Sequence, residues 1–180
     1  QPKFVADMGC GDGKWLSNIY KLITTQTRRG QYLDKHPLLM VGADYNRQAL
    51  NVARSYLKNA GVDCLLLQAN ISDPAEFSLQ LETHGLDIKD GLHLRAFIDH
   101  NRTLLPLRSP EATIDYLSTG NYIDESGELI SGIKLVNSLI EHLKKWAAYI
   151  GSHGLIIIES HTVHPSIAAG HIGLLHNTAF

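Results

Sequence analysis

A glycine-rich turn with two carboxylates lies near the start of the chain, in the sequence Asp7-Met8-Gly9-Cys10-Gly11-Asp12-Gly13. Glycines between a strand and a helix let the backbone approach a ligand closely and direct helix N–H groups at it. The spacing differs from the Gly-x-Gly-x-x-Gly of a dinucleotide site, because Lys14 stands where the third glycine would be. Asp7 and Asp12 would repel a pyrophosphate, but they can attract an ammonium group. The turn therefore predicts a nucleoside ligand that carries a positive charge.

Two further strand ends carry groups that suit the same ligand. Asp44 closes the second predicted strand, where a carboxylate can accept both hydroxyl groups of a ribose. Asn70 and Ile71 follow the third, where a polar and an apolar side chain can flank an adenine ring. Each has an ordinary alternative, since Asp44 can cap a helix and Asn70 can form a turn. Taken together, the three strand ends predict a nucleoside site, in which Asp7 and Asp12 can attract the aminoacyl ammonium of a ligand such as S-adenosylmethionine.

Asp99 and His100 stand just past the fourth predicted strand, where a histidine beside an aspartate can act as a general base. If the charged ligand is a sulfonium that donates a methyl group, the transfer itself needs mainly positioning. If the acceptor is a carbon atom, a proton must also leave, and a base or an electron-withdrawing metal ion becomes necessary. We predict Asp99 and His100 as the catalytic residues; in the alternative, Asp99 caps a turn and His100 packs.

Histidine is abundant, with ten residues in the chain, and it crowds toward the end of the sequence. His161 and His164 follow the fifth predicted strand at the same sheet edge as His100. Together with Glu159, these two histidines are candidate ligands for a Mn or Fe ion, which would chelate a 1,3-dicarbonyl and stabilise its enolate. Their spacing matches no specific metal motif, so polar residues of a substrate loop remain the alternative.

The elements that must position these residues alternate along the chain. Short apolar runs predict buried strands at residues 3–8, 38–44, 64–67, 91–97 and 155–158. Amphipathic segments predict helices at residues 14–25, from an Asn46 cap through Leu57, from Pro74 after Ser72 or Asp73, and at 131–149. Such alternation is typical of a doubly wound, mostly parallel α/β sheet of the Rossmann-like kind. The carboxyl ends of its strands meet at one edge, which would gather the predicted site.

The length of 180 residues suits one domain over residues 1–180, with the irregular stretch 101–130 as a lid or a tolerated insertion. The net charge of -2 and the pI near 6.6 predict no nucleic-acid partner. Apolar runs are only strand-length, so we expect no membrane span. Two distant cysteines suit a reducing, cytoplasmic location.

Residues 5–13 resemble motif I of class I S-adenosylmethionine-dependent methyltransferases, and residues 42–46 resemble their motif II. The similarity runs in order over about residues 3–160. It implies a cofactor site made of Asp7, Gly9, Gly11, Asp12, Asp44, Tyr45, Asn70 and Ile71. The family fold has seven strands and the sequence supplies five, so the last two either lie beyond Phe180, which we expect, or are absent.

The segment 92–102 and the histidine-rich loop after the fifth strand are similar to C-methyltransferase domains of modular polyketide synthases, of the apratoxin loading-module type. That resemblance implies transfer of a methyl group to the α-carbon of a malonyl or β-ketoacyl group. The acyl group would be carried on the phosphopantetheine of an acyl carrier protein, beside neighbouring synthase domains. It also implies a catalytic or metal-binding His100. The alternatives are an O- or small-molecule methyltransferase and a non-catalytic domain that only binds S-adenosylmethionine.

Overall fold

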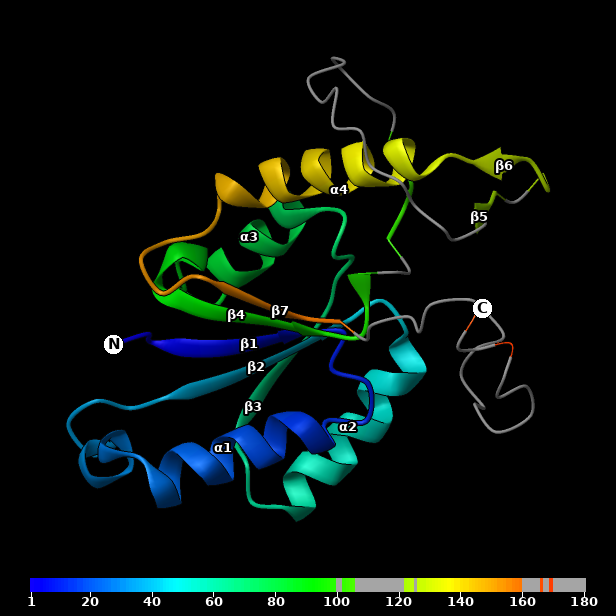
Figure 1. Cartoon of the computed structure of the whole chain (residues 1–180). Helices are drawn as coiled ribbons and strands as arrows, with labels where there is room; N and C mark the ends of the chain where they lie inside the picture. Colours follow the sequence, from blue (N-terminus) through cyan, green and yellow to red (C-terminus); the bar gives the residue numbers. More distant parts are fainter. Residues whose placement is uncertain (100–101, 106–121, 125, 160–165, 167–168, 170–180) are drawn as a thin grey trace. The chain divides into compact units, whose positions relative to one another are not determined.

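The computed structural model describes residues 1–99, 102–105, 122–124, 126–159, 166 and 169 (Figure 1). The chain divides into two compact units. The first comprises residues 1–102 and 145–159, and the second comprises residues 103–144 and 160–180. Every residue predicted to bind the cofactor lies in the first unit.

The first unit is built on a five-stranded sheet with the order β3-β2-β1-β4-β7, in which all four neighbouring pairs are parallel. The strands are β1 (Phe4–Met8), β2 (Leu39–Asp44), β3 (Cys64–Gln68), β4 (Gly91–Ala96) and β7 (Leu155–Ile158). The helices are α1 (Lys14–Gln26), α2 (Arg47–Asn59) and α3 (Pro74–Glu82), with 3-10 turns at Arg28–Tyr32 and Ile88–Asp90. The order reverses direction beside β1, so the predicted doubly wound α/β fold is confirmed.

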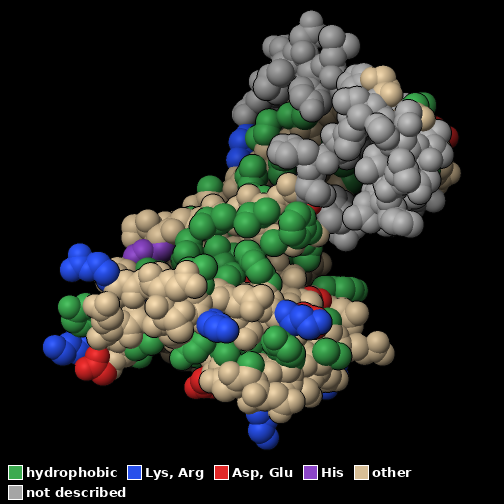
Figure 2. Space-filling model, turned by 60° about the horizontal axis from the view of Figure 1, so that its bottom comes forward, with side chains coloured by type: hydrophobic (Ala, Val, Ile, Leu, Met, Phe, Trp, Pro, Cys, Tyr) green, Lys and Arg blue, Asp and Glu red, His purple; other side chains and the backbone are tan. Residues whose placement is uncertain are grey.

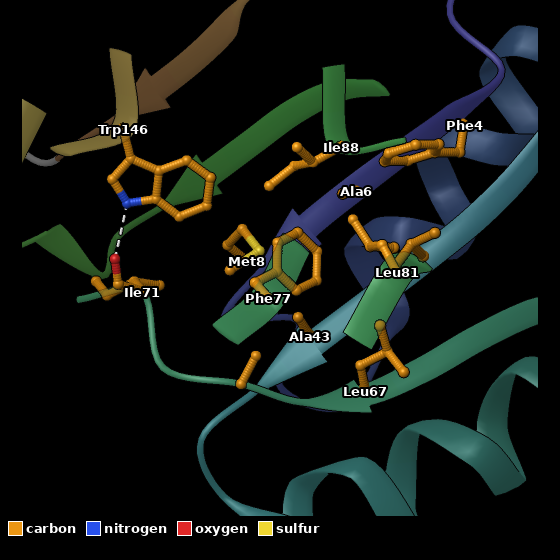
Figure 3. Close-up of a cluster of buried hydrophobic side chains, with 12 residues drawn as sticks. Phe4, Ala6, Met8, Ala43, Leu67, Ile71, Phe77, Leu81, Ile88 and Trp146 are labelled. Carbon is orange, nitrogen blue, oxygen red and sulfur yellow. Dashed lines mark hydrogen bonds between the residues drawn. The ribbon is translucent and has the colours of Figure 1, made fainter. Parts of the chain in front are cut away.

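Helices cover both faces of this sheet. On one face α1 and α2 bury a cluster that includes Leu16, Leu57 and Met40 (Figure 1). On the other face Phe77 of α3 packs with the aromatic ring of Trp146 in the cluster drawn in Figure 3. Because the strands are buried on both sides, their sequences are nearly continuous apolar runs, which is why they are recognisable without a structure.

Helix starts follow the predicted capping residues. The Asn46 side chain accepts a hydrogen bond from the N–H of Gln48, and the Asp73 side chain accepts one from the N–H of Glu76. Both bonds satisfy N–H groups that have no partner within their helix. After α1 the chain forms the 3-10 turn Arg28–Tyr32 before it enters β2.

The second unit contains a short hairpin and most of a long helix. Strands β5 (Tyr122–Ile123) and β6 (Leu129–Ile130) pair antiparallel, and α4 spans Gly132–Ala147. The last residues of α4, Trp146 among them, belong to the first unit. The sequence predicts no strands between residues 101 and 130, because two-residue strands are too short to show an alternating pattern. The role of this stretch as a lid stays a prediction.

Side-chain charge on the face in Figure 2 is mixed, with Lys and Arg side chains scattered over its described part. Among the described residues, no helix has the length and apolar character needed to cross a membrane. The two cysteines are free, with Cys10 buried and Cys64 partly buried.

Candidate cofactor site

The glycine loop between β1 and α1 is attached to the end of β2. The N–H groups of Gly9 and Cys10 both donate to the carbonyl oxygen of Ala43, at 2.7 and 3.0 Å. Gly9 and Gly11 have φ values of 87° and 53°, a backbone conformation that other residues adopt only with strain. Apart from Gly11 and its two chain neighbours, no heavy atom of the described residues lies within 4 Å of the point where a Cβ of Gly11 would stand, which leaves open space above the loop. The loop therefore offers a ligand both room and exposed backbone.

Asp44 holds this loop in place as well as facing the predicted ribose position. Its Oδ2 accepts a hydrogen bond from the N–H of Gly11 at 2.9 Å, and its Oδ1 accepts one from the N–H of Asn46 at 2.7 Å. A carboxylate oxygen has two lone pairs, so each oxygen keeps one acceptor site for a ribose hydroxyl. The loop-bracing role was missed by the sequence analysis, because it depends on a contact 33 positions apart in the chain.

Asp7 is the most unusual charged group of the site. It is 2 % exposed, and its side chain makes no hydrogen bond or ion pair with any described residue. Burial raises the pKa of Asp7 to about 7, and the nearby charge of Asp44 adds to the rise. A buried carboxylate without a partner is costly, and a cationic group close to it would remove that cost. The side chain thus fits the aminoacyl ammonium of S-adenosylmethionine.

Asp12 is placed differently from Asp7. Its side chain is exposed and forms an ion pair with Lys14 at 2.7 Å, and a hydrogen bond to Lys14 lowers the pKa of Asp12. The carboxylate also accepts the backbone N–H of Lys14 at the start of α1. Its predicted attraction for the ligand ammonium stays a prediction, since Lys14 already neutralises it.

The ends of β2 and β3 border a cavity of about 490 Å³, lined by Tyr45, Gln68, Ala69, Asn70, Glu76 and Gln80. The Tyr45 side chain is 75 % exposed. Gln80 donates to Glu76 Oε1 at 3.1 Å and to the carbonyl of Gln68 at 2.9 Å. Sequence analysis missed these α3 side chains, although their spacing of four residues on the helix after Asn70 is a usable signal. Their oxygens and amide groups could pair with the edge of an adenine.

The two predicted adenine residues have contrasting surroundings. Asn70 lines the cavity, and its Oδ1 accepts the N–H of Ser72 at 2.8 Å. Ile71 is buried in the hydrophobic cluster, and its carbonyl accepts the indole N–H of Trp146 at 2.7 Å (Figure 3). Ile71 therefore supports the wall of the site, and contact between its side chain and adenine stays a prediction.

Asp99, predicted as catalytic, is buried and lies 3.4 Å from the Nε atom of the fully buried Arg95. Arg102 donates to the backbone carbonyl of Asp99 at 2.6 Å. A carboxylate held beside a guanidinium is stabilised in its charged form and is a weak proton acceptor. This geometry fits an anchoring role for Asp99, and a catalytic role stays a prediction.

The other predicted catalytic and metal-binding residues, His100, His161 and His164, lie outside the described residues. Within the described part of the chain, no group of three or more His, Cys, Asp or Glu residues could hold a metal ion. The predicted Mn or Fe ion therefore has no support, and its three histidine ligands are untested.

The chain matches one family of known proteins and resembles a solved structure. The sequence pattern of a methyltransferase family described as the AprA MT2-like domain matches residues 1–180, and no curated protein matches the chain. One similar solved structure is the plantazolicin methyltransferase BamL in complex with a triazolic desmethylPZN analog and SAH. It has a TM-score of 0.34 and 15% identity, and the match covers 54% of this chain and 28% of that one. The family match alone spans the whole glycine loop, sheet and acidic site, and the chain therefore belongs to the AprA MT2-like family of methyltransferase domains.

Proposed function

We propose that this chain is the S-adenosylmethionine-binding core of a C-methyltransferase that acts on a malonyl or β-ketoacyl group. The acyl group would be carried on the phosphopantetheine of an acyl carrier protein within a polyketide synthase. The observation that carries the cofactor part is the buried carboxylate of Asp7 beside an open glycine loop. The family match and the resemblance of segment 92–102 to polyketide synthase domains support the acceptor.

The residues of the site divide the binding work. Asp44 would accept the ribose hydroxyls while it braces Gly11, and Asp7 would neutralise the aminoacyl ammonium. When bound, S-adenosylmethionine supplies an electrophilic methyl group on a cationic sulfur. Because these contacts are built before the ligand arrives, the chain would orient the donor without a large rearrangement.

Transfer to carbon requires a defined proton balance. The α-carbon of the acyl group loses a proton and forms a bond to the methyl carbon, while the bond from that carbon to sulfur breaks. The products are the methylated acyl group and S-adenosylhomocysteine. We assign the proton acceptor to His100, which follows the buried Asp99 directly in sequence.

Mass spectrometry of malonyl-loaded acyl carrier protein, incubated with the enzyme and S-adenosylmethionine, tests the proposal. We expect a gain of methyl mass on the acyl group, with fragmentation placing the methyl on carbon and with loss of the product in His100→Ala. Parallel reactions with added Mn or Fe and with a chelator test the metal.

Three results would contradict the proposal. A methyl placed on oxygen would favour the alcohol-methylating alternative. Binding of S-adenosylhomocysteine with no turnover of any acyl-carrier substrate would favour a non-catalytic domain. Full activity of His100→Ala would remove that residue from the mechanism.

A further inference from the structure

Phe97 has a backbone conformation that its side chain disfavours. Its φ is 57°, and among the described residues it alone has a positive φ without being a glycine. A left-handed conformation is unfavourable for a residue with a bulky side chain, because its Cβ crowds the following carbonyl oxygen. The ring is also 59 % exposed, so burial of the ring does not offset the strain. Strain of this kind is concentrated at ligand sites, where the surrounding structure enforces it.

The residues next to Phe97 hold its backbone in this unfavourable conformation. The N–H of Phe97 donates to the carbonyl of Ile158 at 2.8 Å, which extends the pairing of β4 with β7 by one residue. Ile98 lies so close to Gly9 that a Cβ on that glycine would overlap its side chain. Asp99 is then held by the buried guanidinium of Arg95. The chain is thus attached on both sides of the exposed ring.

Arg95 is itself held by the core of the first unit. Its Cζ atom lies 5.3 Å from the ring centroid of Trp146, a distance at which a cation and an aromatic face attract. The indole N–H of Trp146 donates to the carbonyl of Ile71, beside Asn70 of the cavity (Figure 3). A buried network therefore links the position of Phe97 to the wall of the cofactor site.

The sheet register places Phe97 next to the glycine loop. Met8 is paired with Arg95 across the parallel strands β1 and β4, so Ala96 is level with Gly9 and Phe97 follows one residue further along. Asp7 and Asp44 account for the ammonium and the ribose of the donor, and the cationic sulfur lies between those two groups in the molecule. An aromatic face attracts a cation that has lost its water more strongly than it attracts the sulfur of a neutral thioether.

We propose that the ring of Phe97 contacts the sulfonium of the methyl donor, so that the site prefers the charged donor to the neutral product S-adenosylhomocysteine. The proposal rests on S-adenosylmethionine as the cofactor and is independent of the acceptor. Both ligands carry the same ammonium, ribose and adenine, so a difference between their affinities isolates the sulfur atom.

Titration calorimetry of the full chain with each ligand tests this contact. In Phe97→Leu, which keeps an apolar side chain, we expect the affinity for S-adenosylmethionine to fall by about threefold to thirtyfold. The affinity for S-adenosylhomocysteine should change by less than about twofold. Phe97→Tyr keeps an aromatic face and should bind both ligands as the wild type does. Val52→Ala, which trims another exposed apolar side chain, is the matched control.

Phe97→Gly provides a second test, because a purely structural role of the ring predicts a different result for this variant. Glycine relieves the positive φ, so this variant should melt at a higher temperature than the wild type while it loses the preference for the charged donor. A folded Phe97→Gly variant that keeps the wild-type preference for the charged donor would overturn the proposal.

The binding data separate this proposal from the others. Equal weakening of both ligands in Phe97→Leu, or no weakening of either, would overturn the contact while leaving the cofactor site intact. A wild-type chain that binds neither ligand would overturn the cofactor site and this contact together. A failure to methylate malonyl-carrier protein would leave the binding result unaffected.

Discussion

Replacing Asp7 with Asn should stabilise the free protein and remove a pH dependence from cofactor binding. Asp7 is buried, and its pKa is raised from 3.8 to about 7. The folded protein therefore binds this proton more tightly than the unfolded chain does, and stability falls as the pH rises from about 4 to 7. A rise of about three pKa units corresponds to about 4 kcal/mol. At pH 8 the Asp7→Asn variant should gain up to that amount, and at pH 4 it should gain almost nothing.

Cofactor binding should show the opposite preference. A ligand ammonium beside Asp7 favours the charged carboxylate, so below pH 7 the protein must release a proton when it binds. With a pKa of about 7 in the free protein, affinity for S-adenosylhomocysteine should be about tenfold weaker at pH 6 than at pH 8. Asp7→Asn should bind more weakly at pH 8 and lose this dependence.

Two assays check these expectations. Urea denaturation at pH 4 and pH 8 measures stability, and calorimetry in buffers of different ionisation enthalpy counts the protons released on binding. Asp34→Asn is the matched control, because that carboxylate is exposed and lies outside the predicted site. An affinity that does not change between pH 6 and 8, or one that changes equally in Asp7→Asn, would refute the assignment of the ammonium to Asp7.

Three further substitutions test other parts of the site. Asp44→Ala removes both the ribose acceptor and the brace on the glycine loop, so calorimetry should show S-adenosylhomocysteine binding weakened by about 1.5–3 kcal/mol. Gly9→Ala would overlap Ile98 at a positive φ, and it should lower the melting temperature and abolish that binding. Arg95→Met removes the guanidinium beside the buried Asp99 and should cost about 3–5 kcal/mol in urea denaturation, with a smaller loss in the double variant that also carries Asp99→Asn.

Much of the fold could be predicted because its signals are local. Each strand of the sheet is a short apolar run, and the helix starts carry side chains that cap the nearest N–H groups, as at Asn46 and Asp73. Both signals lie within a few residues of the element they describe. The glycine spacing after β1 is equally local. It indicates a site for a cationic nucleoside ligand and argues against a dinucleotide site.

Only some features of the site are predicted by signals between residues close together in the sequence. The acids at Asp7 and Asp44 could be identified from their places at strand ends, but the raised pKa of Asp7 follows from burial that only packing produces. Gln80 joins the cavity through its bond to the carbonyl of Gln68, a contact that its helical spacing from Glu76 does not specify. The strain at Phe97 is likewise a property of the backbone and not of the residue type.

The sequence by itself determined the doubly wound sheet, the glycine loop and the edge at which the cofactor residues gather, because strand patterns and turn residues act over short distances. Tertiary structure alone decided how those residues are held. The bond from Trp146 to Ile71 joins residues 75 positions apart, and Arg95 lies between Trp146 and Asp99. Contacts across such separations depend on the packing of α3 and Trp146 against β4, and the amphipathic pattern of a helix does not specify which distant residues its apolar face will meet.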